Sequence, residues 1–299
     1  MAKYLKSEVI MQIEKDYKID MHMHTIYSDG ELTPEKLIKR AKKNNVNVLS
    51  ITDHDTIMGL KNITSNYGIN IINGIEMTAK VDKGRMHILG YDFDIDNQKL
   101  NNKLKELRTK SYYAIFALLD ILKKDYNIVF DYDDIKKILN SKGNVGRPHI
   151  ARLMIKYGIV ENVEEAFNKY LKEANKKIGL SKKGLHYGEC ISLIKEANGI
   201  AVLAHPNQLY LEDDELEKTL KKLINCGLDG IEVYHSKHTK EESEYYLYLA
   251  SKYNLLISGG SDFHGDITKP DIEVGSGYKN NLKIKQLSLL DRINERNKK

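Results

Sequence analysis

A chain of 299 residues, 41% hydrophobic and 30% charged, is long enough to form one large α/β domain with an insertion, or two domains. This length and composition exclude a wholly disordered protein. No apolar run approaches transmembrane length and the first twenty residues lack the apolar stretch of a secretory signal, so we expect a cytoplasmic protein. The formal charge of +5 mildly favours anionic ligands without the dense basic block of a nucleic-acid-binding arm, and two cysteines, Cys190 and Cys226, indicate neither a disulfide framework nor a thiolate zinc site.

The first third of the chain alternates short β-type runs with helical patterns, which is typical of an α/β fold. The predicted strands are KIDMH at 18–22, NVLSITD at 47–53, INIINGIE at 69–76 and RMHILGYDF at 85–93. Helices are predicted near 34–44 and 56–66. The first of these has Thr33 as a cap and Pro34 in its first turn.

Between about 97 and 180 the alternation stops, and successive segments show helical periodicity without strand runs between them. The alternation then resumes, with helices predicted at 188–198, 213–225 and 240–252, and strands at 200–205, 230–235 and 255–262. We therefore expect one barrel in two parts, 1–96 and 181–299, with an inserted helical subdomain at 97–180. The tail LDRINERNKK is predicted to be a frayed helix end, and SYYAIFALL the packed face of an insertion helix.

Polar side chains gather where the predicted strands end. They are His22, His24, Asp29, Asp53, His54, Asp55, Glu76, His205, His235, Asp262 and His264, with His87 near another strand end. A single histidine in such a place is usually a hydrogen-bonded structural residue, and SDG alone would indicate a turn. Seven of the ten histidines share this placement with carboxylates. Imidazoles and carboxylates at one face of a barrel form a donor set suited to divalent ions.

The motifs HMH, SDG, TDHD, GIE, the downstream His87, AHP and SDFH, in that order, resemble the PHP family, named for polymerases and histidinol phosphatases. The resemblance covers residues 18–96 and about 180–265. It extends into the insertion through VGRPHIARLMIKYGIV at 145–160, which is similar to the subgroup of small PHP phosphoesterases acting on nucleotides and RNA ends. The resemblance implies a distorted (β/α)7 barrel with a helical insertion, which spacing alone does not provide.

The resemblance also implies three divalent metal ions and a set of ligands for each. The first ion would be held by His22, His24, Glu76 and Asp262, the second by a bridging Glu76 with His87 and His205, and the third by Asp29, His54 and His264. Manganese is the expected metal, with iron and zinc as alternatives, because the mixed donor set does not choose among them. Asp53 and Asp55 are expected to orient ligands, although Asp55 could equally cap the next helix.

Such a centre predicts hydrolysis of phosphate esters, because clustered divalent ions generate hydroxide near neutral pH and stabilise a transferring phosphoryl group. No Ser-His-Asp arrangement or G-x-S-x-G elbow indicates a covalent nucleophile. The expected substrates are a 3′,5′-nucleoside bisphosphate or the 5′ end of short RNA or DNA. We expect no membrane association and no obligate protein partner.

Three residues are candidates for substrate binding. Arg147 lies beside glycines at the start of a predicted helix, where its guanidinium and backbone N–H groups can meet phosphate; the alternative is an exposed arginine capping a loop. His149 could assist at the same turn or face away. His235 could contact phosphate or protonate the leaving oxygen, or be a buried structural histidine.

Weaker signals are Tyr210, which could stack on a base, and Lys182 and Lys183, which could steer anions toward the barrel.

Two other functions are compatible with the same motifs. A histidinol-phosphate phosphatase shares the metal barrel but has no need of the helical insertion. A noncatalytic PHP domain would use metal only for structure or partner binding, yet no ligand is missing from this sequence.

Overall fold

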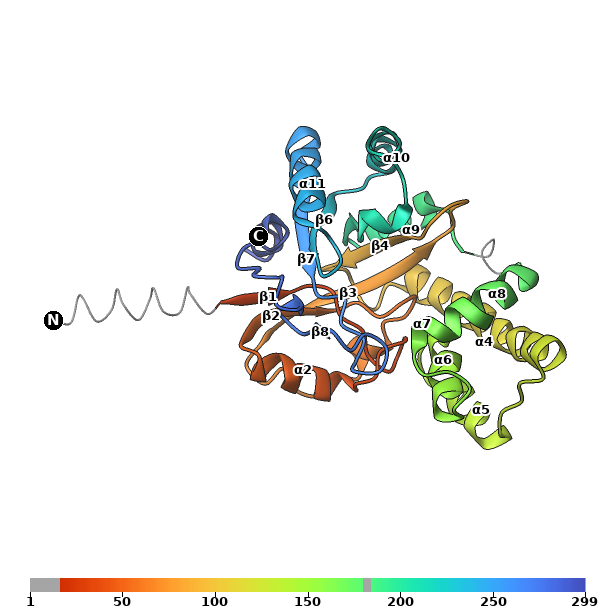
Figure 1. Cartoon of the computed structure of the whole chain (residues 1–299). Helices are drawn as coiled ribbons and strands as arrows, with labels where there is room; N and C mark the ends of the chain where they lie inside the picture. The colour runs from red at the N-terminus through yellow and green to blue at the C-terminus, as the bar shows by residue number, and fades with distance from the viewer. Residues whose placement is uncertain (1–16, 180–183, 299) are drawn as a thin grey trace.

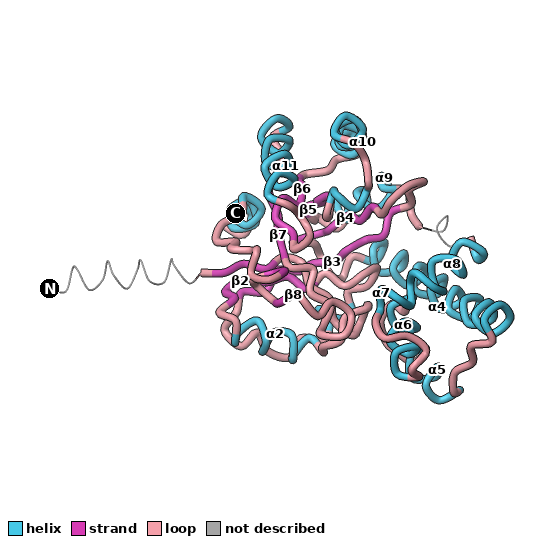
Figure 2. The backbone as a smooth tube through the Cα atoms, in the orientation of Figure 1, coloured by secondary structure: helices cyan, strands magenta, loops and turns pink. Residues whose placement is uncertain are grey.

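Seven β-strands curl into a barrel at the centre of the molecule, and helices surround it (Figures 1 and 2). The computed structural model describes residues 17–179 and 184–298. The barrel strands are β1 (Lys18–Asp20), β2 (Val46–Ile51), β3 (Asn70–Ala79), β4 (Met86–Tyr91), β5 (Ile200–Leu203), β6 (Gly230–His235) and β7 (Leu256–Gly260). Each strand overlaps a run that the sequence predicts.

The order of strands around the barrel follows the chain from β1 to β7. Backbone hydrogen bonds join the two ends of the sheet, with Met21 N donating to Gly259 O at 3.1 Å and His24 N to Phe263 O at 2.9 Å. Strand β4 is antiparallel to both β3 and β5, whereas all other pairs are parallel. A short hairpin connection suffices between antiparallel strands, so no helix separates β3 from β4. The predicted distorted (β/α)7 barrel is confirmed.

Helices cover the outside of the barrel. They are α2 (Pro34–Lys43), α3 (Met58–Lys61), α9 (Tyr187–Glu196), α10 (Asp213–Asn225), α11 (Lys240–Tyr253) and α12 (Ser288–Arg296). Helix α2 forms as the sequence predicts, because Thr33 Oγ1 accepts a hydrogen bond from Lys36 N and the apolar stripe Leu37, Ile38 and Ala41 is buried.

In the described part of the segment between β4 and α9 the elements are helical, and they lie together on one side of the barrel (Figure 1). They are α4 (Gln98–Tyr126), α5 (Tyr132–Leu139), α6 (Arg147–Lys156), α7 (Val163–Ala166), a π-helical turn (Phe167–Leu171) and α8 (Lys172–Ile178). These helices share a hydrophobic cluster separate from the barrel, which includes Ile115, Leu118, Ile150, Met154 and Leu171. The segment therefore has a core of its own.

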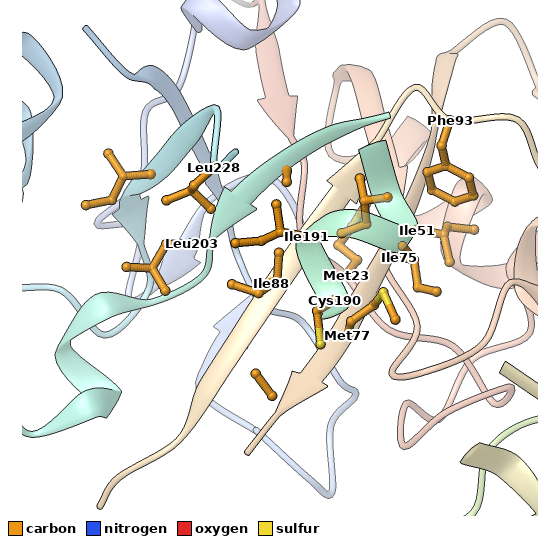
Figure 3. Packing of buried hydrophobic residues seen from close by; sticks show 14 of the residues in the cluster. Met23, Ile51, Ile75, Met77, Ile88, Phe93, Cys190, Ile191, Leu203 and Leu228 are labelled. Atoms are coloured by element: carbon orange, nitrogen blue, oxygen red, sulfur yellow. The ribbon is translucent and has the colours of Figure 1, made fainter. Parts of the chain in front are cut away.

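Two hydrophobic clusters stabilise the barrel. The larger one packs strands against the outer helices, and Figure 3 shows Ile75, Met77 and Ile88 of β3 and β4 beside Cys190 and Ile191 of α9. The second cluster fills the barrel interior with side chains from alternate strand positions, and it includes Ile19, Val48, Leu89, Tyr91 and Val202. Burial on both faces explains why these strands are apolar runs without strict alternation.

Three details differ from the sequence prediction. The helix expected at 56–66 is limited to α3, because residues 62–66 (NITSN) favour caps and turns over helix. The tail is not frayed: α12 buries Leu289, Leu290 and Ile293 against the barrel interior. In SYYAIFALL, Ile115 and Leu118 are packed, but Tyr113 is 67% exposed, since it lies on the opposite side of a single amphipathic helix.

Some expectations fall on residues outside the described ranges. They concern most of the first twenty residues, and Lys182 and Lys183. Among the described residues, no helix is both long and apolar enough to cross a membrane. The cytoplasmic location stays a prediction.

The Tyr91 hydroxyl provides a test of the barrel interior. Tyr91 is fully buried; its hydroxyl donates to Met21 O at 2.9 Å and accepts from Ser258 Oγ at 3.2 Å. Tyr91→Phe keeps the ring but leaves both partners unpaired, so we expect the free energy of unfolding to fall by about 1–3 kcal/mol. Urea denaturation of the metal-free protein measures this. Tyr210→Phe, at an exposed tyrosine, is the control. Urea denaturation curves that coincide for the two variants would contradict the stabilising role of the Tyr91 hydroxyl.

Candidate metal centre

Nine of the predicted site residues converge at one mouth of the barrel. Seven of them follow the carboxyl end of β1, β2, β5 or β7, and Glu76 lies within the long strand β3. His87 is different, because it is the second residue of β4. The antiparallel direction of β4 brings its amino end to the mouth where the parallel strands finish, and His87 therefore reaches the same centre.

One side of the centre is formed by the two histidines of the HMH motif. His22 Nε2 and His24 Nε2 each lie 3.2 Å from Glu76 Oε2. Asp262 Oδ1 lies 3.6 Å from His22 Nε2 and 3.3 Å from His24 Nε2. These four side chains are almost completely buried. The structure thus brings together the four residues expected around the first ion.

The other oxygen of Glu76 faces a second pair of histidines. Glu76 Oε1 lies 2.7 Å from His87 Nδ1 and 2.8 Å from His205 Nε2, and the two ring nitrogens are 3.2 Å apart. His54 Nδ1 approaches the first oxygen, Oε2, at 3.1 Å. Glu76 is therefore within 3.2 Å of five imidazoles, which is the geometry expected of a bridging ligand.

Asp29 marks the third part of the centre. Its Oδ1 lies 3.2 Å from His264 Nε2 and 3.7 Å from His24 Nδ1, while its Oδ2 is 3.9 Å from His54 Nε2. Donor atoms within 4.8 Å of one another form three groups: His24, Asp29, His54 and His264; His22, His24 and Glu76; and His54, Glu76 and His87. His24 and His54 thus each adjoin two groups, a sharing that the sequence does not predict.

Several buried donor atoms at this centre lack a hydrogen-bond partner. They are His22 Nε2, His24 Nε2, His54 Nδ1, Glu76 Oε2 and Asp29 Oδ1. An unpaired polar atom in a protein interior costs about 1–3 kcal/mol. Five such atoms pointing at a common centre, all imidazole nitrogens or carboxylate oxygens, fit divalent metal ions as their missing partners.

The pKa values in the centre reflect burial opposed by neighbouring charges. Burial alone would raise the pKa of Glu76, but His54, His87 and His22 hold it well below its usual value. Burial lowers the pKa of His54 to about 3, against the opposing charges of Glu76 and Asp29. For His24 burial is outweighed by Asp262 and Glu76, which raise its pKa to about 9. Ionised carboxylates among imidazoles thus create a strong preference for a cation at this position.

Two buried carboxylates that the sequence analysis missed hold the ligands in place. Glu232 Oε1 accepts from His22 Nδ1 at 2.9 Å and its Oε2 accepts from His205 N at 2.7 Å. Asp20 accepts from Ser261 N at 2.8 Å and from Gly275 N at 2.7 Å. Both are acidic residues inside apolar strand runs, KIDMH and GIEVYH, and that unusual placement was the available signal.

The carboxylates beside His54 have separate contacts. Asp53 accepts from Thr25 N, Thr25 Oγ1 and Ser28 Oγ at 2.6–2.7 Å, and so orients the loop between His24 and Asp29. Asp55 Oδ1 accepts from Thr78 N at 2.9 Å. The capping alternative for Asp55 is wrong, because Ile57 is the N-cap residue of α3.

A cleft of about 350 Å³ lies between the metal centre and the helical insertion. Asp29, His54 and His87 form part of its barrel side, and Leu107, Ser111, Ala114, Ile115 and Leu118 of α4 form part of the opposite wall. Among the described residues, four cationic side chains line it, namely Lys80, Arg85, Lys110 and Arg147. The sequence analysis identified only Arg147, because the approach of the other three depends on how the insertion packs over the barrel.

Arg147 begins α6, as predicted, and it lines the cleft. Its guanidinium carbon lies 5.3 Å from the centre of the Phe167 ring, which supports the planar group from one side. Burial, with a contribution from Arg85, lowers its pKa to about 10, so it stays protonated at neutral pH. Among the described residues no carboxylate pairs with Arg147 within 4.0 Å, which leaves its charge available to an anion.

His149, His235 and Tyr210 occupy different environments. His149 Nδ1 accepts from Gly146 N at 3.2 Å and caps the first turn of α6 rather than lining the cleft. His235 is buried, and its Nδ1 accepts from Lys237 N while its Nε2 lies 3.2 Å from Asp262 Oδ2. Lys269, which sequence analysis also missed, pairs with the same Asp262 oxygen. Tyr210 is 65% exposed and does not line the cleft.

Comparisons with known proteins agree with this architecture. The family model of the PHP domain matches residues 20–272. A 5′-3′ exoribonuclease of Haemophilus influenzae is 32% identical over 83% of this chain and 90% of its own length. A 3′,5′-nucleoside bisphosphate phosphatase of Chromobacterium violaceum is 28% identical over 82% of this chain and 87% of its own length. Both names are those of phosphoester hydrolases.

A solved structure from Bifidobacterium adolescentis, provisionally described as a metal-dependent phosphoesterase, has the same fold. Its TM-score is 0.77 at 27% identity, and the alignment covers 93% of this chain and 96% of that one. The family match spans most of the barrel and the whole insertion. This chain therefore belongs to the PHP domain family.

Proposed function

We propose that this hydrolase of phosphoester bonds uses three divalent ions to release phosphate from 3′,5′-nucleoside bisphosphates or to remove nucleotides as an exonuclease from the 5′ end of short RNA or DNA. The observation that carries the proposal is the set of unpaired buried donors at the metal centre, two of which, on Asp29 and His54, belong to residues that line a cationic cleft. The names of the two relatives support nucleotide and RNA substrates.

The proposed ligands are those of the family resemblance. His22, His24, Glu76 and Asp262 surround the first position; Glu76, His87 and His205 the second; Asp29, His54 and His264 the third. Manganese is the proposed metal. When bound, such ions lower the pKa of a coordinated water and neutralise charge on the phosphoryl group.

The protein's own side chains then bind and orient the ester. Arg147 has two parallel N–H groups for nonbridging phosphate oxygens and is preorganised by Phe167. Arg85 and Lys80 line the same cleft and balance the remaining charge of a doubly phosphorylated substrate. The apolar wall of α4 offers a surface for a nucleoside, and the volume of the cleft is within the range of small-molecule sites.

We assign His235 to support of Asp262 rather than to acid catalysis. Because its Nδ1 accepts a backbone hydrogen bond from Lys237, the proton of the neutral ring is on Nε2, which is directed at Asp262 Oδ2. The hydrogen bond from Nε2 therefore orients a carboxylate that is a proposed metal ligand.

Metal removal and substrate comparison test the proposal. With Mn²⁺ we expect phosphate release from adenosine 3′,5′-bisphosphate and mononucleotide release from a 5′-phosphorylated RNA oligomer, each faster than phosphate release from histidinol phosphate, and no turnover with a chelator. His22→Ala and Glu76→Ala should abolish metal-dependent turnover, because each removes a ligand from the centre. Faster turnover of histidinol phosphate would overturn the substrate assignment, and absence of turnover on all three would favour a noncatalytic role.

Arg147→Ala tests the phosphate contact. Loss of a charge-assisted hydrogen bond of about 1.5–3 kcal/mol should raise KM about 10- to 100-fold with a smaller change in kcat. Arg147→Lys should recover only part of this, because an ammonium cannot bind two oxygens in the same plane. Arg292→Ala, at a half-exposed arginine on α12, is the control. Steady-state kinetics equal to wild type would remove the reason for placing Arg147 at the site.

Glu232→Gln tests the orientation of His22. An amide nitrogen facing His22 Nδ1 would donate to the ring and move the ring proton to Nε2, the atom that faces Glu76. We expect Mn²⁺ affinity to fall about 10- to 100-fold, measured by isothermal titration calorimetry on the metal-free protein. The control is Glu295→Gln at an exposed position of α12. Unchanged affinity would show that Glu232 does not act on the ligands.

A further inference from the structure

Arg152 links the helical insertion to the metal centre. It lies on α6, one and a half turns after Arg147, and does not line the cleft. Its Nη1 donates to Asp29 O at 2.7 Å and to Thr268 Oγ1 at 3.0 Å. A single guanidinium nitrogen from the insertion thus bridges two loops of the barrel.

These two loops carry ligands of the third metal position. Asp29 provides its carboxylate, and Thr268 follows His264 by four residues in the loop after β7. Glu31, in the first loop, accepts from both Thr268 N and Thr268 Oγ1 at 2.6 Å. Arg152 is therefore one corner of a network that sets the distance between the Asp29 loop and the His264 loop.

The partly buried guanidinium of Arg152 is paired with hydrogen-bond acceptors in its immediate surroundings. Burial lowers its pKa, opposed by Asp29 and Glu31. Within the described residues, no carboxylate oxygen lies within 4.0 Å of its guanidinium nitrogens. Burying a guanidinium without a carboxylate partner costs free energy. Its hydrogen bonds to Asp29 O and Thr268 Oγ1 offset that cost.

A second contact of the insertion acts on the same loop. Asn144 N donates to Tyr27 O at 2.7 Å, two residues before Asp29. The adjacent Gly143 packs so closely that an added Cβ would lie 1.9 Å from Tyr27 O. The loop that carries Asp29 is therefore held by the insertion at two points, and its conformation depends on where α6 lies.

We propose that Arg152 is a positioning residue for the Asp29, His54 and His264 metal position, so that the insertion is part of the scaffold of the metal centre as well as a wall of the cleft. The inference rests on the proposed three-ion site. Because a metal ligand must be placed within a few tenths of an ångström, a small displacement of Asp29 weakens that position selectively. The positions around Glu76, whose ligands Arg152 does not touch, keep their ions.

Metal content measures this directly. The metal-free full-length protein is loaded with Mn²⁺, passed over a desalting column and assayed by inductively coupled plasma mass spectrometry, with calorimetric titration alongside. We expect three ions per wild-type chain and two in Arg152→Ala, whose third ion binds at least 10-fold more weakly. Arg152→Lys keeps the positive charge on a shorter side chain without the guanidinium plane, and should bind the third ion with intermediate affinity.

Lys156→Ala is the matched control, because Lys156 lies on the same helix and its ammonium pairs with Asp134 of the insertion and lies over the Tyr157 ring. It should hold three ions. Kinetics provide a second readout, since loss of the third ion should lower kcat more than it changes KM. Circular dichroism and the Tm of the metal-free forms establish that the variants fold; if Arg152→Ala does not, Thr268→Val removes one acceptor and should weaken the same ion.

The outcomes separate the two proposals. A wild-type protein that retains no Mn²⁺ would refute the proposed metal centre and this inference with it. Three ions in wild type and three, equally tightly bound, in folded Arg152→Ala or Thr268→Val would refute the role of Arg152 alone. Loss of all three ions together in Arg152→Ala would also refute it, because that result indicates a general structural role.

Discussion

The buried carboxylate of Glu76 is the constraint around which this molecule is organised. It lies at the barrel mouth within 3.2 Å of five imidazoles, and several of the facing donor atoms have no hydrogen-bond partner among the described residues. Such an arrangement is costly unless cations complete it. The fold therefore has to hold many mutually repelling or unpaired groups at fixed positions, and much of the surrounding structure serves that requirement.

The closed barrel supplies the rigidity. Strand β3 carries Glu76 and pairs on one side with parallel β2 and on the other with antiparallel β4, so that ligands from several strands meet across the mouth. A further layer of carboxylates fixes the ligands: Glu232 accepts from His22, Asp53 from the loop before Asp29, and Asp20 from the loop after β7. Each of these carboxylates is buried but satisfied by N–H or O–H donors.

The helical insertion has two relations to the barrel. Through α4 and the start of α6 it forms one wall of the cleft and contributes the unpaired charge of Arg147. Through Arg152 and Asn144 it contacts the backbone of the loop that carries Asp29. The proposed substrate cleft and the proposed metal centre are consequently connected through one helix. A change in the insertion that alters specificity is therefore expected to alter the metal centre as well.

The sequence by itself determined the alternation of strands and helices, the presence of a helical insertion and the identity of the residues that converge at the barrel mouth. These features depend on local patterns, apolar runs, capping residues and short motifs, and the order of the motifs indicated the family and its barrel. The cleft position of Arg147 also followed from a local signal, a cation among glycines at a helix start.

Only the tertiary structure decided the direction of β4, which brings His87 to the centre from the amino end of its strand. It also decided the sharing of His24 and His54 between donor groups, and the roles of Glu232 and Arg152. These depend on contacts between distant parts of the chain: His22 and Glu232 are 210 positions apart, and Asp29 and Arg152 are 123 apart. Local periodicity and motif spacing contain no information about such pairings, because packing of the whole barrel and insertion sets them.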